Sequence, residues 1–212
     1  MSDYMSTPSV EELIRWHGEK EFRRLVDVRW PHSHQAFIDR LYEILDEVIR
    51  CLEEDADVHQ TSSEEAISRS VVRQLQRAGY SASVEAHVRG HVDIRVNSGD
   101  GKWCWLGESK IHRKYEDLAE ALLQLLSRYS TGRDPDGGCL IFVRNRGCNS
   151  VIAKWREWLQ SRGIEKLKRT EDDGAHRCFR SVHAHDSAAE YRVRHMGVHL
   201  YYEPRDKSAR GN

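Results

Sequence analysis

The sequence predicts an α/β protein, in which helices flank a mixed central sheet and a helical extension precedes them. Two observations predict this class. From residue 61 onward, segments with helical periodicity alternate with short apolar strands, whereas residues 1–60 show helical periodicity alone. The length of 212 residues suits one compact domain with an appendage.

The N-terminal segment, residues 1–60, predicts two helices. Ser9 and Glu12 have the spacing of a capping box, and a helical run follows them until Trp30-Pro31 breaks it. A second helix, from about 33 to 53, has apolar residues at three- and four-residue steps: Phe37, Leu41, Ile44, Leu45, Val48 and Leu52. The polar run 53–57 predicts a linker. So short a segment cannot bury this stripe alone, so we expect the extension to pack on the core, form a homodimer interface or bind a partner protein.

Residues 61–204 predict the main domain, and residues 205–212 a polar tail. A helix is expected from Thr61 to Ala78, ending at Gly79, which is a typical residue after a helix. The other expected elements, in chain order, are strands at 82–89, 91–97 and 102–110, a helix at about 114–130, a strand at 139–143, a helix at 149–161, and strands at 177–182 and 191–202. Four tryptophans are expected in the core: Trp103, Trp105, Trp155 and Trp158.

The net charge of -1 hides a split between these two parts. Residues 1–60 hold 7 Lys and Arg against 14 Asp and Glu, whereas residues 61–212 hold 26 against 20. A basic excess on one part of a chain is typical of polyanion binders and favours a nucleic-acid partner. No stretch approaches the ~18 apolar residues of a membrane span, and no signal-peptide layout opens the chain. Without such a span we expect no membrane association. The five cysteines form no C-x-x-C pair, which favours a cytoplasmic protein.

Three charged residues stand near the ends of two predicted apolar strands. Alternation along a strand places Asp93 on the opposite side from Val92 and Ile94, and gives Glu108 and Lys110 a shared side. If the strands pair as a hairpin, Asp93 can lie beside Glu108 and Lys110. Buried carboxylates need a partner, and Mg²⁺ prefers carboxylate oxygens with water and phosphate completing its shell. The pattern therefore predicts a magnesium site suited to phosphodiester hydrolysis, with Mn²⁺ as an alternative ion.

Asp93 followed by Glu108-Ser109-Lys110, with Glu64 on the preceding helix, resembles the motif of the PD-(D/E)XK nuclease superfamily. That superfamily has a restriction-endonuclease-like core of order αβββαβ, which residues 61–144 match, although Val92 stands where the superfamily's name has proline. The resemblance implies a metal-dependent endonuclease, most often acting on DNA in restriction, repair or defence against foreign DNA.

The resemblance also implies a role for each matching residue. Some members place a Gln…Tyr pair near the active site, and Gln124 and Tyr129 resemble it with one more residue between them. The implied metal ligands are Asp93, Glu108 and Glu64. The implied catalytic set is Asp93, Glu108, Lys110, Glu64 and Gln124.

Glu64 and Glu65 have a second interpretation, because each lies three residues after a hydroxyl residue. Thr61 with Glu64, and Ser62 with Glu65, both have capping-box spacing, so either glutamate could simply cap the helix. Counting back along the apolar stripe of the helix reaches Glu64, which is therefore the one expected to face the sheet.

The basic residues that follow Lys110 form a further candidate group. His112, Arg113 and Lys114 open the next predicted helix, where they could hold phosphates beside the scissile bond. The alternative is a solvated helix start, although cations are disfavoured at that positive end of the helix dipole. More distant basic residues could extend the same track or simply lie on the surface: Arg144, Arg146, Lys154 and Arg156.

Other functions stay open at this point. The charged residues on the two strands could form a salt-bridge ladder on a solvated sheet face. The fold could be an inactive nuclease that binds nucleic acid or assembles with a partner, or a nuclease acting on RNA. A zinc site is another interpretation, carried by His183, His185, His195 and His199.

Overall fold

The computed structural model describes residues 7–87, 91–129, 134–184 and 189–204. A seven-stranded mixed sheet runs through its centre in the order β1-β2-β3-β4-β7-β6-β5. The three central strands β3, β4 and β7 are parallel, and all other neighbours pair antiparallel. The strands are β1 (Ser81–His87), β2 (His91–Asn97), β3 (Cys104–Ile111), β4 (Asp136–Val143), β5 (Leu167–Asp172), β6 (Cys178–Ala184) and β7 (Glu190–His199).

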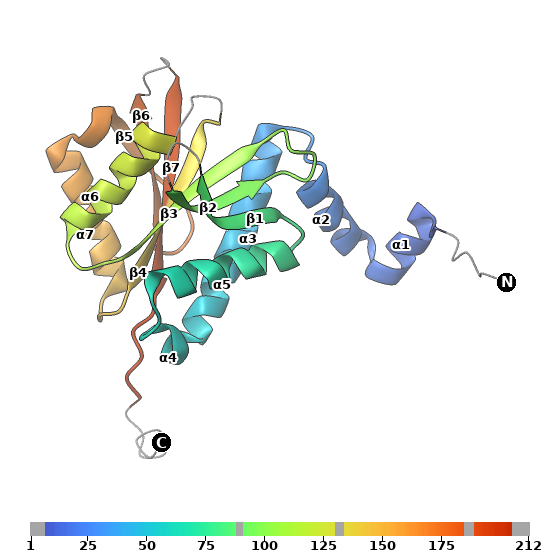
Figure 1. Cartoon of the computed structure of the whole chain (residues 1–212), viewed down its shortest axis with the longest axis horizontal. Coiled ribbons are helices and arrows are strands. Elements are labelled where there is room, and N and C mark those ends of the chain that lie inside the picture. Colours follow the sequence, from blue (N-terminus) through green and yellow to red (C-terminus); the bar gives the residue numbers. More distant parts are fainter. Residues whose placement is uncertain (1–6, 88–90, 130–133, 185–188, 205–212) are drawn as a thin grey trace.

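Helices cover both faces of this sheet (Figure 1). Helices α3 and α5 pack on one face, and α6, the π-helix η1 and α7 pack on the other, each face having its own cluster of buried apolar side chains. The predicted class, a mixed sheet flanked by helices with a helical N-terminal part, is confirmed. The bounds are α3 (His34–Glu54), α4 (Ala56–His59), α5 (Glu64–Arg77), α6 (Tyr115–Leu123), η1 (Gln124–Tyr129), α7 (Cys148–Arg162) and the 3-10 helix η2 (Ile164–Lys166).

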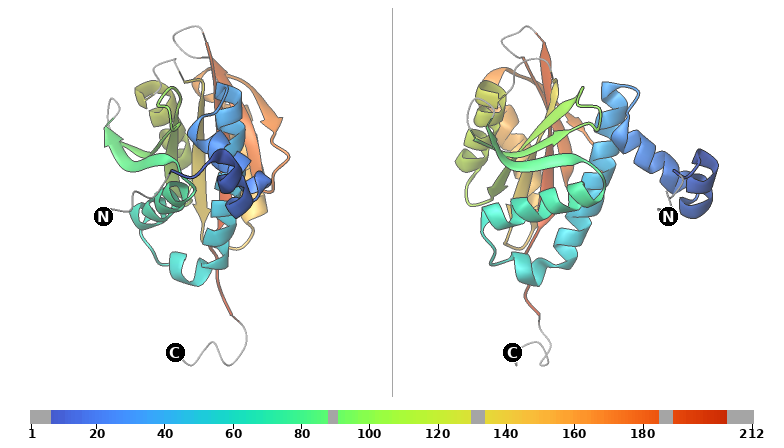
Figure 2. Two further views of the ribbon diagram at one scale, coloured as in Figure 1. Left: turned by 90° about the vertical axis from the view of Figure 1, so that its right-hand side faces the viewer. Right: turned by 45° about the vertical axis from the view of Figure 1, so that its right-hand side comes forward.

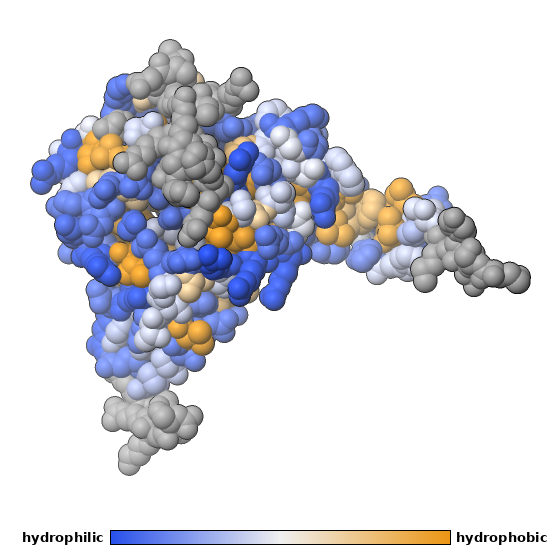
Figure 3. All heavy atoms as spheres, viewed as in Figure 1, coloured by the Kyte–Doolittle hydropathy of each residue, from blue (hydrophilic) through white to orange (hydrophobic). Residues whose placement is uncertain are grey.

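Helices α1 (Val10–His17) and α2 (Glu19–Arg29) form an arm that projects away from the sheet (Figures 1 and 2). One continuous run was the expectation here, but the chain turns at Gly18, whose φ of 79° is a value that L side chains rarely adopt. Helix α1 buries no residue and α2 buries only Val28. Apolar side chains of the arm therefore lie exposed, as its orange patches in Figure 3 indicate.

Helix α3 differs from the arm, although both belong to the acidic segment 1–60. Nine of its residues are buried, and they join the same apolar cluster as α5 and the sheet. The predicted linker at 53–57 is wrong, because α3 continues to Glu54 and α4 begins at Ala56. The segment thus contributes one core helix and one projecting arm.

Strand β5 was not predicted from the sequence. It reads Leu-Lys-Arg-Thr-Glu-Asp and lies at the edge of the sheet, where it pairs only with β6. Charged side chains on an edge strand discourage pairing with other chains, and they also remove the apolar alternation by which strands are recognised. The membrane expectation concerned helices, and none of the described helices is long and apolar enough to cross a bilayer.

Strand β3 is held at the centre of the sheet by Trp105, which is fully buried. Its indole lies against Gly107 and Gly138, where an added Cβ atom would approach the ring to 2.5 Å, so only glycine fits at either position. Its Nε1 donates a hydrogen bond to the Tyr42 hydroxyl at 3.4 Å. This packing fixes the backbone immediately before Glu108.

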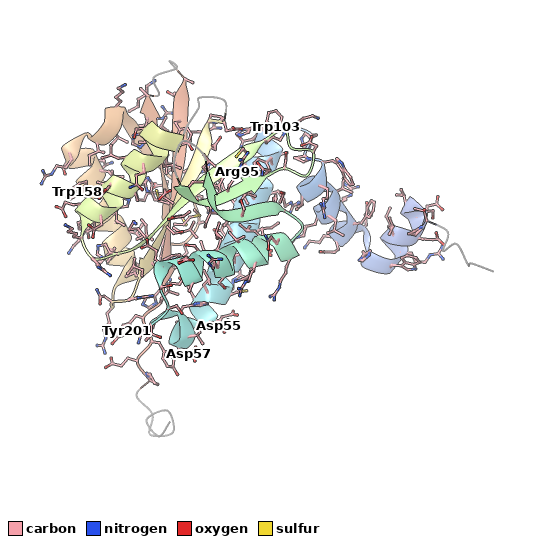
Figure 4. All side chains as sticks on the ribbon, viewed as in Figure 1. Asp55, Asp57, Arg95, Trp103, Trp158 and Tyr201 are labelled. Atoms are coloured by element: carbon pink, nitrogen blue, oxygen red, sulfur yellow. The ribbon has the colours of Figure 1, made fainter. Side chains whose placement is uncertain are left out.

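The other tryptophans also belong to the apolar clusters. Trp155 is fully buried, whereas Trp103 and Trp158 are half-buried and pack at the margins of the clusters on opposite faces (Figure 4). The rings of Trp155 and Trp158 stack with centroids 5.5 Å apart. The expectation that these residues form core is confirmed for Trp105 and Trp155, whereas Trp103 and Trp158 only pack against the core.

Candidate functional site

The site begins where the β2–β3 hairpin stops pairing through its backbone. The register runs from Asn97 opposite Cys104 to Ile94 opposite Gly107, and the ladder ends there. Beyond this point, the side-chain carboxylates of Asp93 and Glu108 accept the hydrogen bonds that link the two strands. The Asp93 N–H donates to Glu108 Oε1 at 3.5 Å, and the Ser109 N–H donates to Asp93 Oδ2 at 2.9 Å. The expected adjacency of Asp93 and Glu108 is confirmed.

The two carboxyl groups repel each other in their ionised forms. Glu108 is 3% exposed, and burial together with the negative charge of Asp93 raises its pKa to about 8. Burial also raises the pKa of Asp93, partly offset by the hydrogen bond from Ser109 and by the charge of Lys110. A hydrogen bond joins the two carboxyls. At neutral pH the pair therefore holds a proton, which Glu108 carries.

Lys110 lies beside this pair and is fixed by Glu64. Its Nζ is 3.0 Å from Glu64 Oε1, while Glu64 Oε2 accepts the Ile111 N–H at 2.7 Å. Burial would lower the pKa of Lys110, but the hydrogen bond to Glu64 and the charges of the three carboxylates raise it, so the amine is an ammonium. Both Glu64 oxygens are thus engaged by the protein.

The structure also decides between the two glutamates at the start of α5. Ser63 is the N-cap, and its hydroxyl accepts the Ala66 N–H at 3.1 Å, so the capping boxes expected from Thr61 and Ser62 are wrong. Glu64 points to the sheet, as the helical phase predicts, whereas Glu65 is exposed and pairs with Arg69 on its own helix.

A cavity of about 670 Å³ opens next to Lys110, between the start of α5, the end of β3 and one side of α6. It brings together three of the expected residues, Glu64, Lys110 and Gln124, with the expected phosphate-binding Arg113. The full lining is Thr61, Ser62, Ser63, Glu64, Lys110, Ile111, Arg113, Asp117, Glu120, Ala121, Gln124 and Arg144. Asp93 instead lines a neighbouring hollow of about 120 Å³, to which Glu64 also contributes.

Arg144 was expected only as an extension of a basic track, yet it lines this cavity. It directly follows β4, which is parallel to β3 with Ile111 opposite Phe142. Because the carboxyl ends of parallel strands meet at one edge of a sheet, the residue after β4 lies near Lys110. That position in the sequence was the signal that could have identified it.

Gln124 is the first residue of the π-helix η1, which ends at Tyr129. A π-helix closes its hydrogen bonds over five residues instead of four, so it absorbs one additional residue per turn. The Tyr129 side chain lies outside the described part of the structure, so the Gln…Tyr pair stays a prediction.

Two of the expected phosphate-binding residues do not line the cavity. The ring centroids of His112 and Tyr115 lie 5.2 Å apart. Both ring nitrogens of His112 are hidden from solvent without a described hydrogen-bond partner. Burial lowers the pKa of His112. Lys114 is exposed and lies 3.6 Å from Asp117. Both stand next to the cavity in sequence but outside its lining.

Two of the four histidines considered for zinc, His183 and His195, belong to a hydrogen-bonded chain, and His199 is not part of it. The Trp155 indole donates to His195 Nδ1 at 3.1 Å, and Ser181 Oγ lies 2.8 Å from both His195 Nε2 and His183 Nε2. Burial lowers the pKa of His195 well below its usual value, so this ring stays neutral. His185 lies outside the described residues. Over residues 7–87, 91–129, 134–184 and 189–204, no group of three or more His, Cys, Asp or Glu side chains is arranged to hold a metal ion.

Comparisons of the chain with protein-family models, with curated proteins and with solved structures found no match. The function must therefore be argued from the residues of the site.

Proposed function

We propose that this protein is a metal-dependent nuclease, with a restriction-endonuclease-like core and DNA as its substrate. The observation that supports this best is the end of the β2–β3 ladder, where Asp93 and Glu108 meet with Lys110 beside them. Two like charges buried side by side are unfavourable unless a cation or a proton compensates them. The resemblance to the PD-(D/E)XK superfamily favours a role in restriction or defence against foreign DNA.

The donor set suits Mg²⁺ or Mn²⁺. A protein commonly supplies one or two carboxylates to Mg²⁺ and leaves the other positions to water and phosphate, so Asp93 and Glu108 would suffice. A divalent cation between them would compensate the charge of Asp93, which raises the pKa of Glu108. When bound, it would activate a water molecule and neutralise charge on the phosphate. Glu64 is better suited to a different role, since Lys110 and the Ile111 N–H already engage its two oxygens.

The chain's own residues would then act as follows. Lys110, charged at neutral pH, would position the attacking water and stabilise negative charge that grows on the phosphoryl oxygens. Glu64 would hold the Lys110 ammonium in place. Gln124 and Arg113, which line the adjoining cavity, would contact the nucleic acid next to the scissile phosphate.

The test is to incubate the protein with plasmid, linear duplex, single-stranded DNA and RNA, in Mg²⁺, Mn²⁺ or EDTA. We expect cleavage of DNA that needs the metal and falls about 100- to 1,000-fold in Asp93→Asn and in Lys110→Met. Glu65→Gln is the matched control, because Glu65 is exposed and pairs only with Arg69 among the described residues. Cleavage that persists in EDTA or survives both substitutions contradicts the proposal. If RNA alone is cleaved, the proposed substrate becomes RNA instead of DNA. Binding without cleavage in any metal indicates an inactive nuclease fold.

We further propose that the arm formed by α1 and α2 binds a second copy of this chain. Val10, Trp16, Leu25 and Trp30 are each at least 39% exposed, so an apolar surface is available. Residues 10–29 hold five acidic and five basic side chains, and a surface without net charge can pair with itself without repulsion. Light scattering should give a dimer mass that falls to the monomer mass in Trp16→Glu. A monomer at high concentration contradicts this interface.

A further inference from the structure

The cavity between α5 and α6 contains two arginines that no carboxylate of the described residues neutralises. Lys110 is paired with Glu64, and Asp117 with Lys114, but neither Arg113 nor Arg144 has an ion-pair partner among those residues. Burial and the like charge of Arg113 lower the pKa of Arg144, and the charge of Glu64, which is already paired with Lys110, only partly offsets this. Two neighbouring guanidinium groups of this kind favour a bound anion.

Arg144 is held in place by the backbone. Its Nη2 donates to the carbonyl oxygens of His59, at 3.1 Å, and of Ser62, and both carbonyls lie just before α5. Its Nε is hidden from solvent and finds no hydrogen-bond partner in the described structure. The guanidinium is therefore positioned before any ligand arrives.

The composition of the lining indicates what part of a ligand is contacted. Among the described residues it contains cations, carboxylates, hydroxyls and Gln124 but no aromatic side chain on which a base could stack. Arginine and hydroxyl groups are the usual contacts of phosphate oxygens, and such contacts carry no sequence information. The cavity thus suits a sugar–phosphate backbone and leaves the bases unread.

Size and charge restrict that backbone to one strand. About 670 Å³ lies within the range of sites that enclose a small molecule, roughly 300–1,000 Å³, whereas a duplex is wider than its major groove of about 12 Å. The lining holds three cations, Lys110, Arg113 and Arg144, and three carboxylates, Glu64, Asp117 and Glu120, so it has no excess of positive charge with which to hold two phosphate backbones. The exposed carboxylate of Glu120 on α6 would repel a second phosphate backbone.

We propose that this cavity binds the backbone of a single nucleic-acid strand through Arg113 and Arg144 and excludes a duplex. As a statement about the substrate strand, this rests on the proposed nuclease function. As a statement about binding, it can be tested without cleavage.

The experiment measures fluorescence anisotropy of a labelled oligothymidylate strand and of a blunt duplex of equal length, in EDTA. We expect the strand to bind at least about 10-fold more tightly than the duplex, and Arg144→Gln and Arg113→Gln each to weaken strand binding about 10-fold. Arg162→Gln is the control, because Arg162 is exposed on α7 over the Trp158 ring and does not line the cavity. Arg113 is exposed, so its substitution tests the site even if Arg144→Gln loosens the start of α5.

The outcomes separate this inference from the nuclease proposal. Duplex binding as tight as strand binding, or arginine variants that bind like Arg162→Gln, overturns the single-strand site even if the protein cleaves DNA. Strand binding that depends on Arg113 and Arg144, without cleavage in any metal, supports the site and overturns the nuclease.

Discussion

Two clusters of charged side chains lie against the same sheet, and they differ in how their charges are arranged. The arginine cluster consists of Asp46, Asp173, Arg180 and Arg194. Arg194 and Asp173 have side chains that are each 2% exposed, and their N and O atoms approach to 2.6 Å. Asp46 lies 3.0 Å from Arg194, and Arg180 lies 2.6 Å from Asp173, so opposite charges alternate.

In the arginine cluster, pairing outweighs the cost of burial. Burial alone would raise the pKa of Asp173 and lower that of Arg194, yet the hydrogen bonds between them shift both pKa values the other way. The carboxylate pair Asp93 and Glu108 shows the opposite balance, because burial raises both of their pKa values and the charge of Asp93 raises that of Glu108 further. Removing one partner from a balanced buried cluster costs stability, whereas an unbalanced cluster is itself costly and calls for a functional reason.

The largest expected effect comes from breaking the balanced cluster. Arg194→Met leaves Asp173 buried without its main partner, so the free energy of unfolding should fall by about 3–5 kcal/mol. Urea unfolding followed by circular dichroism measures this. Arg180→Met is the comparison, since the Arg180 side chain is 34% exposed and its loss should cost about 1 kcal/mol or less. Equal losses in the two variants would show that the cluster is not organised around Arg194.

Removing a charge from the carboxylate pair should instead raise the free energy of unfolding. The pKa of Glu108 is about 8 in the folded protein against 4.5 for a free side chain, so Glu108 stabilises the fold least once pH has risen through 8. Glu108→Gln cannot ionise. Its free energy of unfolding should match that of the unaltered protein near pH 5 and exceed it by about 2–4 kcal/mol near pH 9. Glu65→Gln should show no such growth with pH, and a Glu108→Gln variant that is less stable at pH 9 contradicts the repulsion argument.

The contrast between the two clusters explains what could be predicted from sequence. The adjacency of Asp93 and Glu108 could be predicted because a short hairpin with alternating side chains leaves one register. The orientation of Glu64 toward the sheet could be predicted from the helical periodicity of its segment. The arginine cluster could not, since Asp46 and Asp173 are far apart in sequence and meet only when α3 packs on the sheet.

The same reasoning accounts for the features that were missed. Strand β5 has too few apolar residues to be recognised, and only its pairing with β6 makes it a strand. The π-helix continues the apolar pattern of α6, so periodicity alone does not reveal it. Arg144 meets Lys110 through the parallel pairing of β3 and β4, a contact that depends on the strand order of the whole sheet.

If the carboxylate pair binds a divalent cation, binding must displace the proton that Glu108 holds at neutral pH. Titration calorimetry with Mn²⁺ at pH 7, in two buffers of different ionisation enthalpy, should report release of about one proton per ion. The affinity should rise about 10-fold per pH unit below the pKa of Glu108, which is about 8, and level off above it. Metal binding with no proton release would mean that the ion is held elsewhere.

The smallest expected effect concerns Glu64, which contacts Lys110 and not the carboxylate pair. Glu64→Gln keeps an acceptor for the Ile111 N–H but removes the charge that raises the pKa of Lys110. We expect kcat for DNA cleavage to fall about tenfold with little change in KM, because the ammonium is held less firmly while the cavity is intact. The alkaline limb of the pH–rate profile should move to lower pH, since Lys110 then loses its proton more easily. A loss of Mn²⁺ binding in this variant would instead show that Glu64 is a metal ligand, and the proposal that Asp93 and Glu108 alone hold the ion would be wrong.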